Sequence, residues 1–107
     1  MKINVLNVCA DGTLEVLKID SSVEAVRREL GACIDNIKLF TDVQSFICRL
    51  PNDFSENVLL PGIRGYVIIT GGRGSYLTGL TDECISNLFK IFGKEYSHGK
   101  ARLSNQL

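Results

Sequence analysis

The pattern of apolar and polar positions predicts that the chain opens with a β-hairpin. The segments Ile3–Cys9 and Leu14–Ile19 are rich in Val, Ile and Leu, which favour strands. Asp11-Gly12 lies between them, and this dipeptide favours the left-handed backbone of a tight hairpin turn. Leu14 and Val16 are expected to face the interior.

A short amphipathic helix is predicted next. Apolar residues recur at helical spacing in Val23–Leu30. Ser21 and Glu24 have the spacing of a capping box, in which Ser21 is the N-cap. Glu24 and Arg28 form a favourable i,i+4 pair, and Gly31 is typical of a helix C-terminus. The chain therefore predicts a helix that packs its apolar stripe on the sheet.

The middle of the chain gives a weaker pattern. Residues Ile34–Phe40 are expected to form a strand. Within Thr41–Leu50, the capping-box spacing of Thr41 and Gln44 indicates a helical turn, whereas apolar residues alternate with polar ones as in a strand. We favour the strand. Pro51–Gly62 is expected to be a loop whose apolar residues pin it to the core: Phe54, Val58, Leu59 and Leu60.

The stretch from Ile63 to Gly93 holds the clearest elements. Tyr66–Ile69 is apolar on both faces, which is typical of a central strand. The glycine-rich turn Gly71–Gly74 follows, as phosphate loops do, but it lacks the spacing of known phosphate motifs and no helix starts directly after it. Because Tyr76-Leu77 reads as a short returning strand, we interpret the glycines as a hairpin turn.

The last predicted helix is marked by its cap and its apolar face. Thr81 is the expected N-cap, and Leu80 and Ile85 have the spacing of a hydrophobic staple. Gly93 ends the helix. One apolar face should dock on the sheet, and it consists of Ile85, Leu88, Phe89 and Phe92.

These elements predict an α+β fold, with a small mixed or antiparallel sheet of about five strands and two helices packed on it. Residues 1–96 are expected to form a single domain. Residues 97–107 are polar and are expected to be a disordered tail.

Composition narrows the class of partner. The 107-residue chain has no net charge, so a nucleic-acid partner is not expected. From Lys90 onward there are four basic residues and one acid, whereas the preceding part has eleven acids and eight basic residues. No apolar run is long enough to span a membrane, and no export signal is seen, so we expect a cytosolic protein without a membrane partner.

Few residues have the pattern of a catalytic or metal site. The cysteines lie among apolar neighbours without C-x-x-C spacing, so buried free thiols are expected, with no metal and no cofactor. The only histidine is His98, in the predicted tail. No catalytic residue is therefore predicted. Basic and aromatic residues do lie close together at two places, and these are the candidate binding residues: Arg64, Tyr66, Arg73 and Tyr76.

Two blocks, which together cover about half of the chain, are Glu15–Asp20 with Val23–Ala25 and Leu30–Ile34, and Ile63–Ile69 with Leu80–Ile85 and Phe89–Phe92. On these blocks the chain resembles a family of small phage and plasmid proteins, the domain of unknown function 3846. The resemblance implies a mobile-element origin and a small α+β fold, and it brings no catalytic residues. The family's hairpin rich in Asn and Gly near Asn52 is not seen, so the strand order between Thr41 and Pro61 is left open.

Three functions follow as hypotheses. The first is a non-catalytic phage or mobile-element protein that binds a host or phage protein, such as an anti-CRISPR-like inhibitor of bacterial defence; the acidic bias before Lys90 would suit mimicry of nucleic acid. The second is a small ligand- or nucleotide-binding module that uses the Gly71–Gly74 turn. The third is a self-associating structural protein, in which a second copy covers an exposed face of Val67–Ile69.

Overall fold

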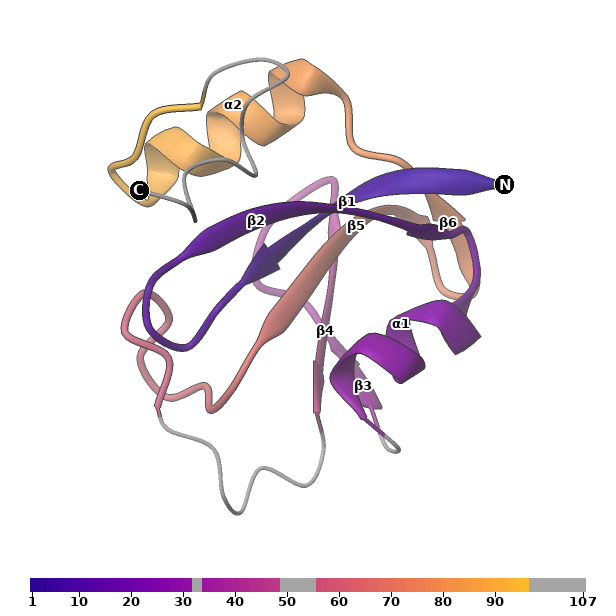
Figure 1. Ribbon diagram of the computed structural model, residues 1–107, viewed down its shortest axis with the longest axis horizontal. Coiled ribbons are helices and arrows are strands. Elements are labelled where there is room, and N and C mark those ends of the chain that lie inside the picture. The colour runs from indigo at the N-terminus through magenta and orange to yellow at the C-terminus, as the bar shows by residue number, and fades with distance from the viewer. Residues whose placement is uncertain (32–33, 49–55, 97–107) are drawn as a thin grey trace.

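The computed structural model describes residues 1–31, 34–48 and 56–96, and it has the predicted α+β fold (Figure 1). The described residues form a six-stranded antiparallel sheet and two helices. In chain order the elements are β1 (Lys2–Val8), β2 (Leu14–Asp20), α1 (Val23–Leu30), β3 (Ile34–Ile37), β4 (Gln44–Cys48), β5 (Val67–Arg73), β6 (Tyr76–Thr78) and α2 (Asp82–Ile91).

Strand β5 is the centre of the sheet, as its apolar sequence predicts. The strand order is β2-β1-β5-β4-β3, and β6 pairs with β5 outside this path. The first half of β5 pairs with β1 and β4, so that Ile68 lies opposite Asn7 on one side and Phe46 on the other. The second half pairs with β6, where Gly72 lies opposite Leu77.

The two helices cover opposite faces of the sheet (Figure 1). Because side chains alternate along a strand, Ile68 packs with Val26 of α1, whereas Val67 and Ile69 pack with Ile85 of α2. Both faces are thus buried within one chain. The apolar residues of β5 therefore give no reason for a second copy to cover them.

Helix α1 begins one residue later than its capping-box spacing predicts. Ser22, not Ser21, is the N-cap, and its Oγ accepts a hydrogen bond from the backbone N–H of Ala25 at 3.1 Å. Glu24 forms its ion pair with Arg27, at i,i+3, rather than with Arg28. Strand β2 extends to Asp20, so two residues, Ser21 and Ser22, separate it from the first residue of the helix. Gly31 follows the helix with φ 115°, as predicted.

The connection between β3 and β4 decides between the two interpretations of the middle segment. Strand β3 ends at Ile37, three residues before the predicted end, and β4 confirms the strand interpretation of Thr41–Leu50. Asp42 has φ 68°, a left-handed conformation that turns the chain between the strands.

The loop before β5 packs through only part of its apolar content. Leu59 and Leu60 are partly buried against the core, as expected. Val58 is also predicted to pin the loop, but this is wrong, because 65% of the residue's surface is exposed. The prediction for Phe54 lies outside the described residues.

The glycine-rich segment forms a hairpin, as predicted, although the turn is shorter than expected. Strand β5 continues through Gly71 and Gly72, and only Gly74-Ser75 forms the turn. A Cβ on Gly72 would lie 2.0 Å from the backbone oxygen of Tyr76, and φ at Gly72 is +92°. A glycine here is therefore explained by the close approach of β6.

Helix α2 matches its sequence signals. Thr81 Oγ1 accepts from the backbone N–H of Cys84 at 3.1 Å, and Leu80 packs with Ile85 in one cluster. Gly93 has φ 73°, and its N–H donates to the carbonyl of Lys90. Within residues 1–31, 34–48 and 56–96, neither helix has the length and apolar content needed to cross a membrane. The predicted tail lies outside the described residues.

Candidate functional site

Two hollows lie at opposite ends of β5. One is beside Tyr66 and Ile68, at the start of the strand, and the other is beside Gly72 and Arg73, at its end. We call them the acidic hollow and the hairpin hollow. They differ in charge and contain different candidate binding residues.

The hairpin hollow has a volume of about 760 Å³. One wall is the tip of the β5–β6 hairpin, Gly72–Gly74 with Tyr76, and the other is the end of β3 and the start of β4. Gln44 joins these walls: its Oε1 accepts from Asn36 Nδ2 at 2.8 Å, and its Nε2 donates to the carbonyl of Gly71 at 3.3 Å. Because Gln44 is buried, these two bonds hold the walls in register.

Cations and one aromatic ring border the hairpin hollow. Lys38 and Arg73 are exposed, and neither forms an ion pair with another residue that the structure describes. Asp42 is the acid of the same hollow. Tyr76 lies opposite Arg73 across the hairpin, and 73% of it is exposed. This surface can hold a carboxylate or phosphate group beside an aromatic contact.

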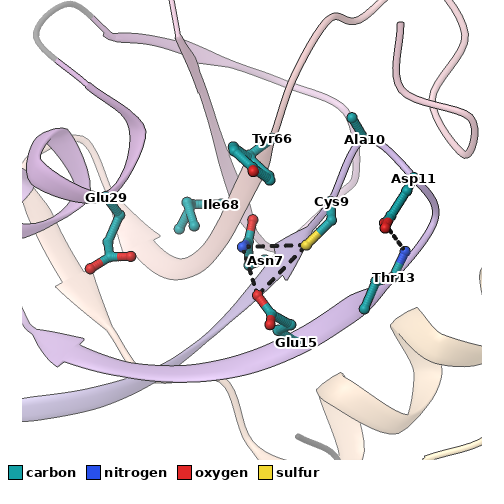
Figure 2. A pocket seen from close by; sticks show the side chains of 9 residues that line it. All are labelled: Asn7, Cys9, Ala10, Asp11, Thr13, Glu15, Glu29, Tyr66 and Ile68. Carbon is teal, nitrogen blue, oxygen red and sulfur yellow. Dashed lines mark hydrogen bonds between the residues drawn. The ribbon is translucent and has the colours of Figure 1, made fainter. Parts of the chain in front are cut away.

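The acidic hollow has a volume of about 630 Å³ and lies next to the β1–β2 turn (Figure 2). Its polar floor comes from a cross-strand pair, since Asn7 of β1 lies opposite Glu15 of β2. Asn7 Nδ2 is 3.1 Å from Glu15 Oε1 and 3.6 Å from Cys9 Sγ. Cys9 Sγ donates to the same Glu15 oxygen at 3.6 Å. Asn7, Cys9 and Glu15 thus form one hydrogen-bonded cluster.

The cysteine of this cluster is held as a thiol. Burial, followed by the nearby Glu15 carboxylate and its hydrogen bond and then by Asp11, raises the pKa of Cys9 to about 12. Burial also raises the pKa of Cys84, with smaller effects of Asp42 and Glu83. A thiolate is the reactive form of cysteine, so these two side chains are poor nucleophiles at neutral pH.

Further groups complete the acidic hollow. Asp11 accepts from the backbone N–H of Thr13 at 2.9 Å, and this bond lowers the pKa of its carboxyl group. Glu29 enters from α1, and Tyr66 borders the opening with 44% of its surface exposed. Asn7 Oδ1 is buried and has no hydrogen-bond partner among the residues that the structure describes. The hollow therefore combines carboxylates, an aromatic ring and an unused acceptor.

A buried asparagine positions the edge of the acidic hollow. Asn57 Nδ2 donates to the carbonyls of Val8, Cys9 and Gly65 at 3.2, 3.3 and 2.9 Å. Its Oδ1 accepts from the backbone N–H groups of Leu59 and Leu60. These bonds tie the loop to the end of β1 and so place the residue after Gly65, which is Tyr66.

The four predicted binding residues do not form one site. The hairpin register brings Arg73 and Tyr76 together at the hairpin hollow. Tyr66 lies at the other end of β5, in the acidic hollow, and Arg64 forms an isolated backbone bridge with Glu56. Arg64 and Tyr66 are thus separated from Arg73 and Tyr76 by the length of β5.

Sequence reasoning missed the polar cluster of the acidic hollow. Its apolar neighbours predict a buried free thiol at Cys9, but the cysteine is only partly buried and is bonded to Asn7 and Glu15. The signal was present in the hairpin: a tight turn at Asp11-Gly12 places Asn7 and Glu15 opposite one another on one face. No sequence pattern predicts that Glu29 lines the acidic hollow or that Lys38 lines the hairpin hollow, because their positions depend on packing between distant elements.

Metal ligands do not converge in the described part of the chain: no three His, Cys, Asp or Glu side chains there lie close enough to hold a metal ion. Comparisons of the chain with models of protein families, with curated proteins and with solved structures give no match. The resemblance to the phage and plasmid family remains a prediction.

Proposed function

We propose that this chain is a non-catalytic protein-binding module that contacts its partner through the tip of the β5–β6 hairpin. The observation that carries the proposal is the cross-strand pair of Arg73 and Tyr76, which is exposed at a well-supported hairpin. Arginine and tyrosine are enriched among the residues that dominate binding energy at protein interfaces. A tyrosine exposed as fully as Tyr76 contributes little to the fold of the free chain.

The hairpin presents these side chains with little freedom. Gly72 packs directly against the backbone of β6, and Gln44 bonds the β5 backbone to the opposite wall of the hollow. A pre-organised surface loses less conformational entropy on binding than a mobile loop does. This rigidity supports a role for the tip as a recognition element.

The charge of the hairpin hollow indicates the chemistry of the partner. Two cations, Lys38 and Arg73, and one acid, Asp42, line the hollow. The two cations have no ion pair among the described residues. An acidic segment of the partner would complement this surface. Association should therefore become slower as ionic strength rises, because salt screens the attraction between exposed charges.

The biological setting of the proposal comes from the resemblance to phage and plasmid proteins. A small protein of a mobile element that occludes a host protein would serve as an inhibitor of bacterial defence, of the anti-CRISPR-like kind. The protonated state of the Cys9 and Cys84 thiols supports a binding role over thiol catalysis.

Co-purification from cells that express the tagged protein tests this proposal. Wild type should recover a protein partner in stoichiometric amount, and Arg73→Ala and Tyr76→Ala should lose it. Ile91→Ala is the control, because it removes an exposed large side chain of α2 that lines neither hollow. Loss of the partner in the control as well, or recovery of none by wild type, would contradict the proposal. Restored phage growth in a host with active defence would support the inhibitory role.

A second candidate function is supported by one observation: Gly72 and Gly74 line the hairpin hollow together with Lys38 and Arg73. A small anionic ligand, such as a nucleotide, would fit this combination of backbone and cations. Against it, Gly72 is already explained by packing on β6. A thermal-shift screen with nucleotides and phosphorylated metabolites decides, and no shift for wild type would retire this candidate.

A further inference from the structure

We infer that one flank of α2 is a self-association surface, and that its occupant is α2 of a second copy in antiparallel orientation. This inference goes beyond the proposed function, because it concerns a different element and a different partner. It rests on the spacing of three side chains along the helix and on two opposite charges beside them.

The fold covers α2 on its inner face and along one flank. Ile85, Leu88 and Phe89 are buried and pack on the sheet. Beside them the chain turns back along the helix, so that the rings of Tyr96 and Phe89 lie 5.1 Å apart and Tyr96 Oη donates to Asp82 Oδ1 at 3.3 Å. The chain itself therefore occupies the flank next to Phe89.

The opposite flank of α2 carries Cys84, Asn87 and Ile91, which we call the α2 seam. These residues recur at i, i+3 and i+7, the spacing of the contact positions of paired helices. Ile91 is 61% exposed, and the seam borders a groove of about 430 Å³ whose other wall is formed by residues 40–43. The seam and the groove together offer a surface on which a second helix can pack.

The charges beside the α2 seam select a second copy as the occupant. Glu83 and Lys90 are exposed and form no ion pair with another residue that the structure describes. They lie on the same side of the seam but are seven residues apart, which is roughly 10 Å along the helix and too far for them to pair with each other. A two-fold axis that makes the helices antiparallel brings this side of both helices together. Glu83 of each copy then faces Lys90 of the other, and two ion pairs form at once.

Asn87 lies between the two charges along the helix and is therefore next to the two-fold axis. Its amide has both donors and an acceptor, so the Asn87 side chains of two copies can bond to each other. A single polar residue in such a seam fixes the register and the orientation of paired helices. The seam thus specifies one arrangement of the two copies.

The helix dipole gives a second reason for the same two charges, because Glu83 lies in the first turn of α2 and Lys90 in the last. The two explanations predict different results when both charges are reversed. If the dipole alone explains the charges, the double reversal carries both unfavourable changes. If the two-fold contact explains them, the double reversal rebuilds both ion pairs and restores association.

Sedimentation equilibrium of the full chain over a concentration series tests the inference. Wild type should dimerise with a Kd on the order of 100 µM, because one short pair of helices buries less area than a stable complex does. Ile91→Asp should weaken dimerisation about tenfold or more, since it places a charge in the apolar part of the seam. Circular dichroism confirms that each variant is folded.

Charge reversal tests the orientation. Glu83→Lys and Lys90→Glu should each weaken dimerisation about tenfold, because each turns two attractive contacts into two repulsive ones. The double variant should associate to within about threefold of wild type. Lys18→Glu, which reverses an exposed lysine of β2, is the matched control and should dimerise as wild type does.

The inference is overturned if wild type is a monomer at millimolar concentration, or if Ile91→Asp dimerises as wild type does. It is also overturned if the double reversal associates more weakly than either single reversal. Because Ile91 is exposed in the free chain, Ile91→Asp keeps the test decisive if a charge reversal fails to fold. A different protein that binds this flank while the chain alone stays monomeric would likewise exclude a second copy as the occupant.

Discussion

The side-chain amide of Asn57 donates a hydrogen bond to the backbone carbonyl of Val8 at 3.2 Å, across 49 residues of chain. The same amide reaches Gly65, so one side chain joins the end of β1 to the residues that enter β5. Because Asn57 is buried, water cannot take over its hydrogen bonds to these carbonyls.

We expect Asn57→Ala to lower the free energy of unfolding by about 3 kcal/mol, since it leaves several buried backbone groups without partners. Chemical denaturation measures this change. Ser45→Ala is the matched control. Ser45 Oγ is also buried but has no hydrogen-bond partner within residues 1–31, 34–48 and 56–96, so its removal should change stability by less than about 1 kcal/mol or increase it. Similar losses in both variants would contradict the role assigned to Asn57.

The two glycines of the hairpin should respond differently to alanine. Gly72→Ala places a Cβ against the backbone of Tyr76 and forces a left-handed alanine, so we expect a loss of about 3 kcal/mol. Gly74→Ala should lose only about 1 kcal/mol, because its φ is +55° but no atom lies near the new Cβ. Thermal unfolding compares the two. Equal losses would show that the packing of β6 is not the reason for Gly72.

The N-cap of α1 distinguishes two adjacent serines. Ser22→Ala removes the acceptor for the Ala25 N–H and should destabilise the protein by about 1 kcal/mol. Ser21→Ala should be close to neutral, because the backbone N–H of Ser21, rather than its side chain, bonds to the carbonyl of Met1. Urea denaturation of the two variants measures the difference, and a larger effect at Ser21 would restore the cap predicted from sequence.

The thiol of Cys9 should make stability depend on alkaline pH. Its pKa is raised from 9.0 to about 12 in the folded state, so the folded protein disfavours the thiolate. Below pH 9 both states hold the thiol and stability is unaffected by it. Between about pH 9 and 12 the unfolded state loses its proton first, and stability should fall as pH rises. Denaturation at pH 8 and pH 10.5, for wild type and Cys9→Ser, measures this, and an equal fall in both would contradict the assignment.

The same cluster predicts the reactivity of Cys9. Alkylation by iodoacetamide at pH 8 should be slow, because the thiolate is scarce. Glu15→Gln removes a neighbouring negative charge and should accelerate the reaction, whereas Glu83→Gln should not affect Cys9. Mass spectrometry of the modified peptide separates this cysteine from the others. Fast alkylation in wild type would show that the cluster does not protect the thiol.

Elements with strong local signals could be predicted from the sequence. The turn at Asp11-Gly12, the apolar run of β5 and the cap at Thr81 each specify their structure through a few neighbouring residues. Errors occurred where a neighbouring element decided the outcome. Strand β2 extends to Asp20, and the helix cap is Ser22 rather than the predicted Ser21.

The candidate sites were harder to predict, because they depend on contacts between distant segments. Asn57 resembles any polar loop residue in the sequence, and only the folded chain brings it to Val8. Arg73 and Tyr76 were identified together because a hairpin keeps them adjacent. Glu29 and Lys38 were not, since each enters its hollow from a different element.

The central strand β5 also sets the distance between the two hollows. The strand has seven residues and is bonded to neighbouring strands along its length, so it spans roughly 20 Å as a stiff rod. The hairpin hollow lies at one end of this strand and the acidic hollow at the other. Molecules held at the two ends would be kept at a constant separation, and the protein would act as a spacer with a defined polarity.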